Sequence, residues 1–177
     1  MFMHSYITAY LNGEPGLVED VVRSFGFLTL GSRMKRIGEK LQADTQKIMD
    51  ELGAPLQASQ YPFLAAIDRH GPLTVGELAE AVGITQPGAT RTVGQLVELG
   101  MLETAPAPGD QRRRIVTLTK EGKRLVATAK RDVWPRISEA VADLCGSLDG
   151  PLLDQLAAIE DGLAAAPLDR RAARVTA

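Results

Sequence analysis

The 177-residue sequence is poor in the side chains that build metal centres and many active sites: it contains one cysteine, Cys145, and two histidines, His4 and His70. A single cysteine excludes an intrachain disulfide and a thiolate cluster around a metal. Two histidines and one cysteine also leave a zinc site short of ligands unless carboxylates complete it. Neither histidine has the spacing of a nucleophile–base pair, and no glycine-rich phosphate loop follows a strand. We therefore expect no enzyme activity, no metal and no cofactor.

The sequence also lacks long apolar runs and a strong charge of one sign. No apolar run reaches the length of a membrane span, and no signal segment opens the chain, which indicates a cytoplasmic protein without a membrane partner. The formal net charge of −2 gives no bulk positive field that would announce a nucleic-acid partner. The local charge is different, because residues 112–124 are strongly basic and the acidic residues are spread over the rest of the chain.

The stretch 73–119 carries the clearest local signals, and it begins with two short helices. Thr74 and Glu77 have the spacing of a capping box at the start of the first helix. Gly83 supplies the left-handed turn that ends this helix. Thr85 can then cap a second helix. The pattern predicts two helices joined by a tight turn.

The second helix, which should end at Gly100, has one apolar and one polar face. Its apolar positions are Ala89, Val93, Leu96 and Val97. The residues that we expect to contact bases or phosphates are Gln86, Pro87, Thr90, Arg91 and Gln95. A helix, a glycine turn and a second helix with a polar outer face is the arrangement that places side chains in the major groove of DNA. The alternative is a solvated helix in an all-α bundle.

A β-hairpin is predicted after the second helix. Its strands are expected over 101–104 and 113–118, with a proline- and glycine-rich loop over 105–110. Three consecutive arginines lie beside the loop: Arg112, Arg113 and Arg114. Arginines on a projecting hairpin suit the narrow, strongly negative minor groove of DNA. A run of solvated charges is the simpler alternative.

Together these motifs resemble the winged helix-turn-helix domain of MarR-type transcriptional regulators. The matching segments are LTVGELAEAVGI for the first helix and turn, TQPGATRTVGQLVELGML for the recognition helix, and IVTLTKEG after the wing arginines. The resemblance covers about residues 52–122. It implies that Arg112 reaches the minor groove and that Asp110, two positions earlier, helps to hold the wing. The family often has Ser or Thr where this chain has Gly88, which puts the sequence preference in doubt but not the docking mode.

The predicted fold class is mainly α with a small β-hairpin wing, in which a winged helix-turn-helix domain is flanked by N- and C-terminal dimerisation helices. The expected parts are an N-terminal arm (1–16), N-terminal dimerisation helices (17–52), the DNA-binding domain (53–122), C-terminal dimerisation helices (123–166) and a disordered tail (167–177). The terminal helices carry apolar stripes with no partner inside so small a domain. A second copy of the chain would bury these stripes.

Two terminal regions carry more detailed expectations. Phe2, Tyr6 and Tyr10 recur at helical spacing, which suits a partner-binding arm, a lid over a ligand pocket, or packing on the body or across a dimer. A helix is predicted from Leu17 to Leu28, and Pro135 should interrupt the C-terminal helices.

The resemblance also implies an effector cleft beside the helix that supports the recognition unit. The ligand contacts that it suggests are Tyr61, Phe63, Arg69 and His70. Core packing and surface capping explain these residues equally well. The ligand would be a small aromatic or other apolar effector. Cys145 lies among apolar residues at the end of a helix, where an inert buried thiol is the default and a redox switch the alternative.

The predicted function is a sequence-specific, DNA-binding transcriptional regulator, a repressor in most of the resembled family. It would act as a homodimer on double-stranded DNA with a pseudo-palindromic operator, and a small effector would release it. The alternative is a winged-helix module for protein–protein contact without sequence-specific DNA binding. Salt dependence distinguishes the two, because binding through several phosphates must weaken steeply as salt rises.

Overall fold

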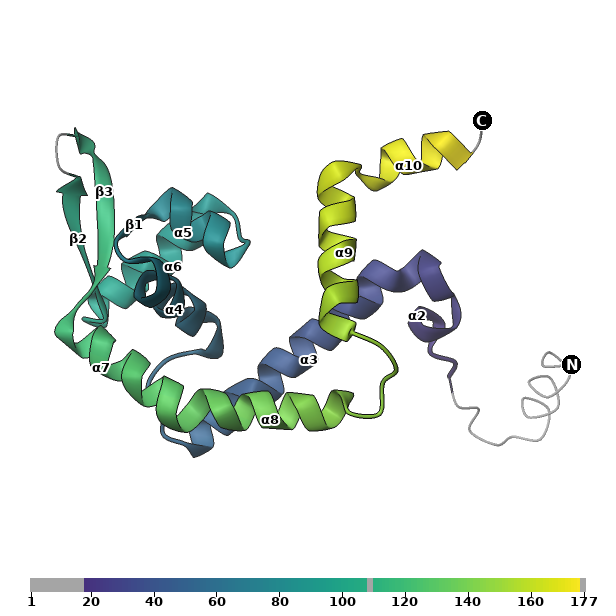
Figure 1. The fold of residues 1–177 in the computed structure, drawn as a ribbon, viewed down its shortest axis with the longest axis horizontal. Helices are drawn as coiled ribbons and strands as arrows, with labels where there is room; N and C mark the ends of the chain where they lie inside the picture. The colour runs from purple at the N-terminus through teal and green to yellow at the C-terminus, as the bar shows by residue number, and fades with distance from the viewer. Residues whose placement is uncertain (1–17, 108–109, 176–177) are drawn as a thin grey trace, which may run out of the picture. The chain divides into compact units, whose positions relative to one another are not determined.

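The computed structural model describes the backbone of residues 18–107 and 110–175, and their side chains except at 110–113 and 173–175 (Figure 1). It is mostly helical with a small three-stranded antiparallel sheet, which confirms the predicted fold class. The chain divides into two compact units, Met1–Val126 and Ala127–Ala177. The predicted aromatic stripe of Phe2, Tyr6 and Tyr10 lies outside the described residues.

Short helical segments precede a long helix in the first unit. They are α2 (Val21–Ser24), the 3₁₀ helix η1 (Gly26–Thr29) and α3 (Leu30–Glu51). The single helix predicted from Leu17 to Leu28 was therefore wrong. Gly26 has a φ of +56°, and this left-handed backbone conformation ends α2 and redirects the chain.

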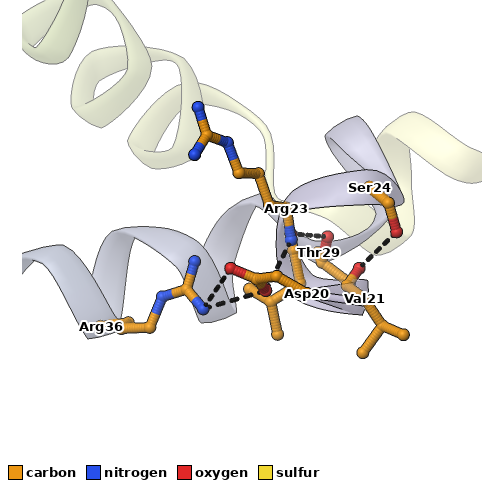
Figure 2. A network of polar contacts seen from close by, with 7 residues as sticks. Asp20, Val21, Arg23, Ser24, Thr29 and Arg36 are labelled. Atoms are coloured by element: carbon orange, nitrogen blue, oxygen red, sulfur yellow. Dashed lines mark hydrogen bonds and ion pairs between the residues drawn. The ribbon is translucent and has the colours of Figure 1, made fainter. Parts of the chain in front are cut away.

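Polar contacts tie α2 to α3 (Figure 2). Asp20, the N-cap of α2, accepts a hydrogen bond from the backbone N–H of Arg23 at 3.1 Å and forms an ion pair with Arg36 of α3 at 2.9 Å. Thr29 donates through Oγ1 to the Val22 carbonyl at 2.7 Å. The hydrogen-bonded Arg36 guanidinium holds the pKa of the Asp20 carboxyl below its ordinary value. Because this ion pair is exposed, it stabilises the N-terminal segment only modestly.

Four α-helices, a short 3₁₀ helix and a three-stranded sheet follow α3. The elements are η2 (Ala58–Gln60), α4 (Tyr61–His70), β1 (Leu73–Thr74), α5 (Val75–Val82), α6 (Gln86–Glu98), β2 (Leu102–Ala107), β3 (Asp110–Leu118) and α7 (Lys120–Thr128). Their largest fully buried side chains are Phe63, Leu64, Leu78, Leu96, Leu102, Val116 and Val126. These residues come from α4, α5, α6, both long strands and α7, so all of these elements share one core.

The strands are ordered β1–β3–β2 and all neighbours are antiparallel. Leu73 of β1 pairs with Val116, and Leu102 of β2 pairs with Leu118. The sequence analysis missed β1, because a two-residue strand leaves no alternating pattern to detect. The hairpin between β2 and β3 projects from the helices (Figure 1).

The hairpin strands are longer than the sequence predicted. β2 continues through Pro106 to Ala107, where the sequence analysis expected a loop from Ala105, and β3 already begins at Asp110. Pro106 is tolerated in β2 because this is an edge strand, where a missing N–H need not break the sheet. The proline signal was therefore misread as the end of the strand.

The second unit begins within a continuous run of helix. After α7 come a π-helix (Ala129–Val133), α8 (Trp134–Cys145), α9 (Leu152–Ala165) and α10 (Leu168–Val175). The interruption predicted at Pro135 takes the form of the π-helix, in which the Trp134 N–H donates to the Ala129 carbonyl. This bond spans one residue more than a bond of an α-helix. It fits a site where the next residue, a proline, has no N–H to donate.

The tail 167–177, predicted to be disordered, instead forms the helix α10 over Leu168–Val175. Arg171 donates from Nε to the Ala166 carbonyl at 2.7 Å and from its terminal nitrogen to the Gly162 carbonyl. These bonds cap the C-terminal end of α9 and hold the start of α10 beside it. The sequence analysis missed α10, because a contact such as that of Arg171 with unpaired carbonyls at the end of α9 produces no periodic pattern in the sequence.

Apolar side chains are left exposed along the second unit. They are Val141, Leu144, Leu148, Leu153, Ile159, Leu163 and Leu168. Neither α8 nor α9 contains a buried residue, and the buried residues of the unit, as far as it is described, are Ala129 and Val133. No helix in the described part of the chain combines the length and the apolar character that crossing a membrane would require.

Candidate nucleic-acid interface

The turn that leads into the recognition helix α6 is fixed by α5. Oγ1 of Thr74 accepts a hydrogen bond from the Glu77 N–H at 3.2 Å, and the Glu77 carboxylate accepts one from the Thr74 N–H at 2.7 Å. At the other end of α5, Gly83 adopts a φ of +72°. The predicted capping box and glycine turn are thus confirmed. Together they set the direction in which the chain enters α6.

A tight cap starts α6. Oγ1 of Thr85 accepts a hydrogen bond from the Gly88 N–H at 3.4 Å, and Pro87 lies in the first turn, where no N–H is needed. A Cβ atom at Gly88 would lie 3.3 Å from Thr85 Oγ1 and 3.6 Å from Ile84 Cδ1. A larger residue at this position would press on the cap. The glycine therefore suits the cap and leaves backbone, not a hydroxyl, at this point of the helix surface.

The two faces of α6 separate as the sequence predicted. The buried side chains are Ala89, Val93 and Leu96. All the residues expected to contact DNA from this helix are exposed: Gln86, Pro87, Thr90, Arg91 and Gln95. Val97, predicted to face inward, is 38% exposed because it lies at the edge of the apolar stripe.

The hydroxyl of Thr90 is already bonded within α6. It donates to the Gln86 carbonyl at 2.9 Å, and Thr92 Oγ1 donates to the Gly88 carbonyl at 3.2 Å. Such bonds use the hydroxyl proton, so Thr90 is left with oxygen lone pairs and its methyl group. Beside it, Arg91 supplies a charged donor and Gln86 an amide. This combination of donor, acceptor and methyl group matches the functional groups of base edges in the major groove.

Arg114 is bound within the wing. Its guanidinium donates to Thr104 Oγ1 at 2.8 Å and lies 3.4 Å from the Thr104 carbonyl, although the side chain remains exposed. This cross-strand contact joins β3 to β2. The sequence analysis did not connect these two residues, because their pairing depends on a strand register that the mispredicted loop concealed. Thr104 is therefore a wing residue that the sequence analysis missed.

Residues 110–113 are described only by their backbone, which belongs to β3. Ala107 pairs with Asp110, whereas its neighbour Pro106 pairs with Arg114, so the three residues 111–113 form an irregular bulge in β3. Bulges re-aim side chains and twist the strand. The predicted contacts Asp110, Arg112 and Arg113 thus lie at the bulge beside the end of the hairpin, and their side chains lie outside the described part.

The four predicted effector contacts do not gather at one site. Tyr61 and Phe63 are 5% and 1% exposed, whereas Arg69 and His70 at the end of α4 are exposed. The Tyr61 hydroxyl has no hydrogen-bond partner among the described residues, and burial raises the pKa of this phenol. Tyr61 and Phe63 serve the core, and the two exposed residues point to the surface.

A half-open hollow of about 310 Å³ lies at the C-terminal end of α4. Its lining residues are Ile67, Asp68, Gly71, Pro72, Thr117, Leu118 and Lys123. Ile67 and Leu118 are buried and form an apolar floor, whereas Asp68 and Lys123 are exposed and charged. The sequence analysis missed this hollow, because its lining comes from three separate stretches of the chain.

Groups of three or more side chains able to hold a metal ion do not occur among the described residues. Cys145 is half-buried at the end of α8. Whether its thiol is inert stays a prediction.

The comparison with known proteins agrees with this geometry. The model of the MarR family matches residues 54–113. An HTH-type transcriptional regulator of Mycobacterium bovis is 31% identical over 91 residues, which are 51% of this chain and 64% of that protein. The match thus spans less than two thirds of the relative's length.

Two solved structures bound to DNA share the fold. The transcriptional repressor CouR, bound to a 23-mer DNA duplex, is 25% identical with a TM-score of 0.61, over 79% of this chain and 94% of that one. A mutant of Escherichia coli MarR in complex with operator DNA is 23% identical with a TM-score of 0.63, over 82% and 96% of the two chains. Residues 54–113 of this chain thus match the MarR family, and the fold, with its helix-turn-helix and its wing, is that of MarR winged-helix structures.

Proposed function

We propose that this protein is a sequence-specific DNA-binding transcriptional regulator, and specifically a repressor. The observation that carries the proposal is the division of α6: three side chains anchor it in the core, and every residue assigned to DNA contact is exposed on the opposite side. A helix held rigidly from behind can present donors and acceptors at fixed positions in a major groove. The repressor role rests on relatives such as CouR, whose name states that activity.

The proposed DNA contacts fall into two kinds: contacts with phosphates, which position the protein, and contacts with bases, which specify the sequence. Gln86, Thr90 and Arg91 lie near the N-terminal end of α6 and are assigned to bases or phosphates, and Gln95 is assigned to a phosphate. Arg112 is assigned to the minor groove at the wing. Because Arg114 is engaged by Thr104, its role is to stiffen the wing as well as to add positive charge.

The acting form is a homodimer. The exposed apolar side chains of α8, α9 and α10 have no partner within the described part of one chain, and a second copy of the same helices would bury them. A two-fold dimer carries two recognition helices about 34 Å apart, or a multiple of this spacing. The operator is therefore pseudo-palindromic.

A small aromatic or other apolar effector releases the DNA. The hollow at the C-terminal end of α4 supports this part of the proposal, because its apolar floor is flanked by charged side chains. The charged side chains are Asp68 and Lys123, and the predicted contacts Arg69 and His70 are not among the lining residues.

The proposal is tested by selection of bound fragments from randomised duplex DNA, followed by titration of the recovered site at two salt concentrations. A two-fold symmetric site whose affinity falls steeply with salt is the expected result. Arg91→Ala should weaken binding, and it should do so most at particular base positions. Arg136→Ala, at an exposed position of α8, is the matched control and should bind as the original protein does.

Recovery of no enriched sequence, together with weak binding that does not depend on salt, would contradict the proposal. A winged-helix module for protein–protein contact would then be the better assignment.

A further inference from the structure

The end of the recognition helix is bonded to the start of α7 by one residue, Thr119. Its Oγ1 donates to the Gly100 carbonyl at 2.7 Å and lies 3.2 Å from the Met101 carbonyl. Its backbone N–H donates to the Met101 carbonyl at 3.1 Å. The same Oγ1 accepts a hydrogen bond from the Gly122 N–H at 3.0 Å and so caps α7. One threonine therefore bonds groups on both sides of the wing, because Gly100 lies nineteen positions before Thr119 and Gly122 three positions after it.

Gly122 makes the second part of this junction. It is buried in the first turn of α7, and a Cβ atom placed there would overlap the Met101 carbonyl oxygen and lie 3.1 Å from Leu118 Cδ2. The backbone of α7 thus packs against the Met101 carbonyl with no room for a side chain. Because the obstacle is backbone, a rotamer change cannot relieve the overlap.

Met101 is in turn fixed to α6. Its N–H donates to the Leu96 carbonyl at 2.9 Å, and Gly100, with a φ of +71°, turns the chain out of the helix. The next residue, Leu102, pairs with Leu118 at the base of the wing. The C-terminal end of α6, the base of the wing and the first turn of α7 therefore meet at one point.

We infer that Thr119 and Gly122 are positioning residues for DNA binding, because they lock the recognition helix, the wing and α7 into one rigid block. We call Gly100, Met101, Thr119 and Gly122 the α6–α7 clamp. The inference rests on the proposed function, since it assigns the clamp to the same DNA-binding surface. None of its four residues is among those assigned to DNA contact. They act by fixing the angle between a major-groove element and a minor-groove element, which must both fit one duplex.

The test uses the full chain and three variants. Thr119→Val keeps the shape and removes the hydroxyl, Thr119→Ser keeps the hydroxyl as the matched control, and Gly122→Ala adds the methyl group that the clamp excludes. Each is titrated onto the selected operator and onto unrelated duplex DNA, at a temperature where circular dichroism shows it folded. Thr119→Val and Gly122→Ala should lose about tenfold or more in operator affinity, the equivalent of at least one good base contact. Binding to unrelated DNA should stay unchanged, and Thr119→Ser should behave as the original protein does.

Loss of operator binding and non-specific binding in equal proportion, or no loss in Thr119→Val, would overturn the inference, because a purely structural role predicts these results. The stability of the clamp is measured separately, as the rate of hydrogen exchange at the Gly100 and Met101 amides. This exchange should be faster in Thr119→Val. If the original protein selects no operator, the proposed function fails, and unchanged exchange at these two amides would then overturn the clamp independently.

Discussion

The winged helix region and the second unit use apolar residues in opposite ways. In the first region, Leu64, Leu78 and Leu96 lie fully buried among α4, α5, α6 and the sheet. In the second unit, Leu144 and Leu153 are 64% and 78% exposed, although they sit on helices of similar apolar character. The winged helix region therefore completes its core within one chain. The second unit leaves its apolar side chains exposed, which is typical of a surface that binds a partner.

The proposed DNA contact and the proposed association of two chains have different structural requirements. The recognition helix must present its side chains at fixed positions, and burial of its inner face provides this. In the proposed homodimer, the helices of the second unit need only a partner of the same sequence. Substitutions in the two regions should therefore be distinguishable. A substitution in the core of the winged helix region should alter folding of the single chain, whereas one on the exposed apolar surface of the second unit should alter association.

The largest effect is expected from charges on the proposed pairing surface. Changing Leu153 and Leu163 together to Asp should abolish dimerisation, because burial of each leucine in a dimer is worth about 1.5–3 kcal/mol. Sedimentation velocity should show a monomer. The circular dichroism spectrum should still show a folded, helical chain, because the core of the winged helix region is unchanged. Glu160→Gln, an exposed polar change on the same helix, is the control. A double variant that remains dimeric would place the pairing surface elsewhere.

A core change should show the opposite behaviour. Leu64→Ala should lower the free energy of unfolding by about 2–5 kcal/mol, since it removes buried contacts and leaves a cavity. The expected loss is independent of protein concentration once the dimer is saturated. Urea denaturation measures it, with Leu153→Ala as the comparison. If Leu153→Ala costs as much in a dilute, monomeric sample, the contrast between the two regions does not hold.

The wing arginine tests the reading surface alone. Arg112→Ala should weaken operator binding by about 1–3 kcal/mol and leave the oligomeric state unchanged. Fluorescence anisotropy with the selected operator measures the change, and Arg136→Ala controls for the loss of one positive charge. Equal affinity of Arg112→Ala and the original protein would remove the wing from the interface.

A smaller effect is expected at the base of the wing. Thr104→Val removes the hydroxyl that accepts from Arg114, and one such bond is worth about 0.5–1.5 kcal/mol. The wing should become more mobile, and operator affinity should fall by less than in Arg112→Ala. Faster amide exchange in β2, measured by NMR, would accompany it. An effect that exceeds that of Arg112→Ala would mean that wing order matters more than the minor-groove contact.

The smallest effect concerns the ion pair between Asp20 and Arg36. The pKa of Asp20 is lowered in the folded chain by the Arg36 hydrogen bond. Its stabilising contribution is therefore present above the ordinary carboxyl pKa of 3.8 and is lost as pH falls through the lower, folded-state pKa. NMR titration of the Asp20 carboxyl measures this shift. In Arg36→Gln the pKa of Asp20 should rise toward its ordinary value, because the largest cause of the shift is removed, whereas an unchanged pKa would assign the shift to the α2 N-cap bonds.

The parts of the fold that were predicted correctly have short-range causes. The Thr74–Glu77 capping box, the turn at Gly83 and the start of α6 after Thr85 each depend on residues within a few positions of one another. The same local pattern identified the five exposed positions of α6 that were assigned to DNA contact, although it wrongly placed Val97 on the buried face. The site residues on α6 were therefore accessible from sequence as positions, and their contacts with DNA stay predictions.

The parts that were missed depend on contacts between distant residues. β1 exists because β3 pairs with it. Thr104 matters because the register pairs Arg114 with Pro106, two positions along β2, from where its guanidinium reaches the Thr104 hydroxyl. In each of these cases the partner residue lies outside the local window in which periodicity and capping signals are read. The hollow at the end of α4 was missed for the same reason.

Pro106 affects the tendency of this protein to aggregate at high concentration. It lies in β2, an edge strand whose free side would otherwise offer a continuous row of backbone donors and acceptors to another chain. A residue without an N–H interrupts this row, and β-sheets in natural proteins use such interruptions to resist edge-to-edge aggregation. The hairpin can therefore project into solvent without recruiting the hairpin of a neighbouring molecule into a shared sheet.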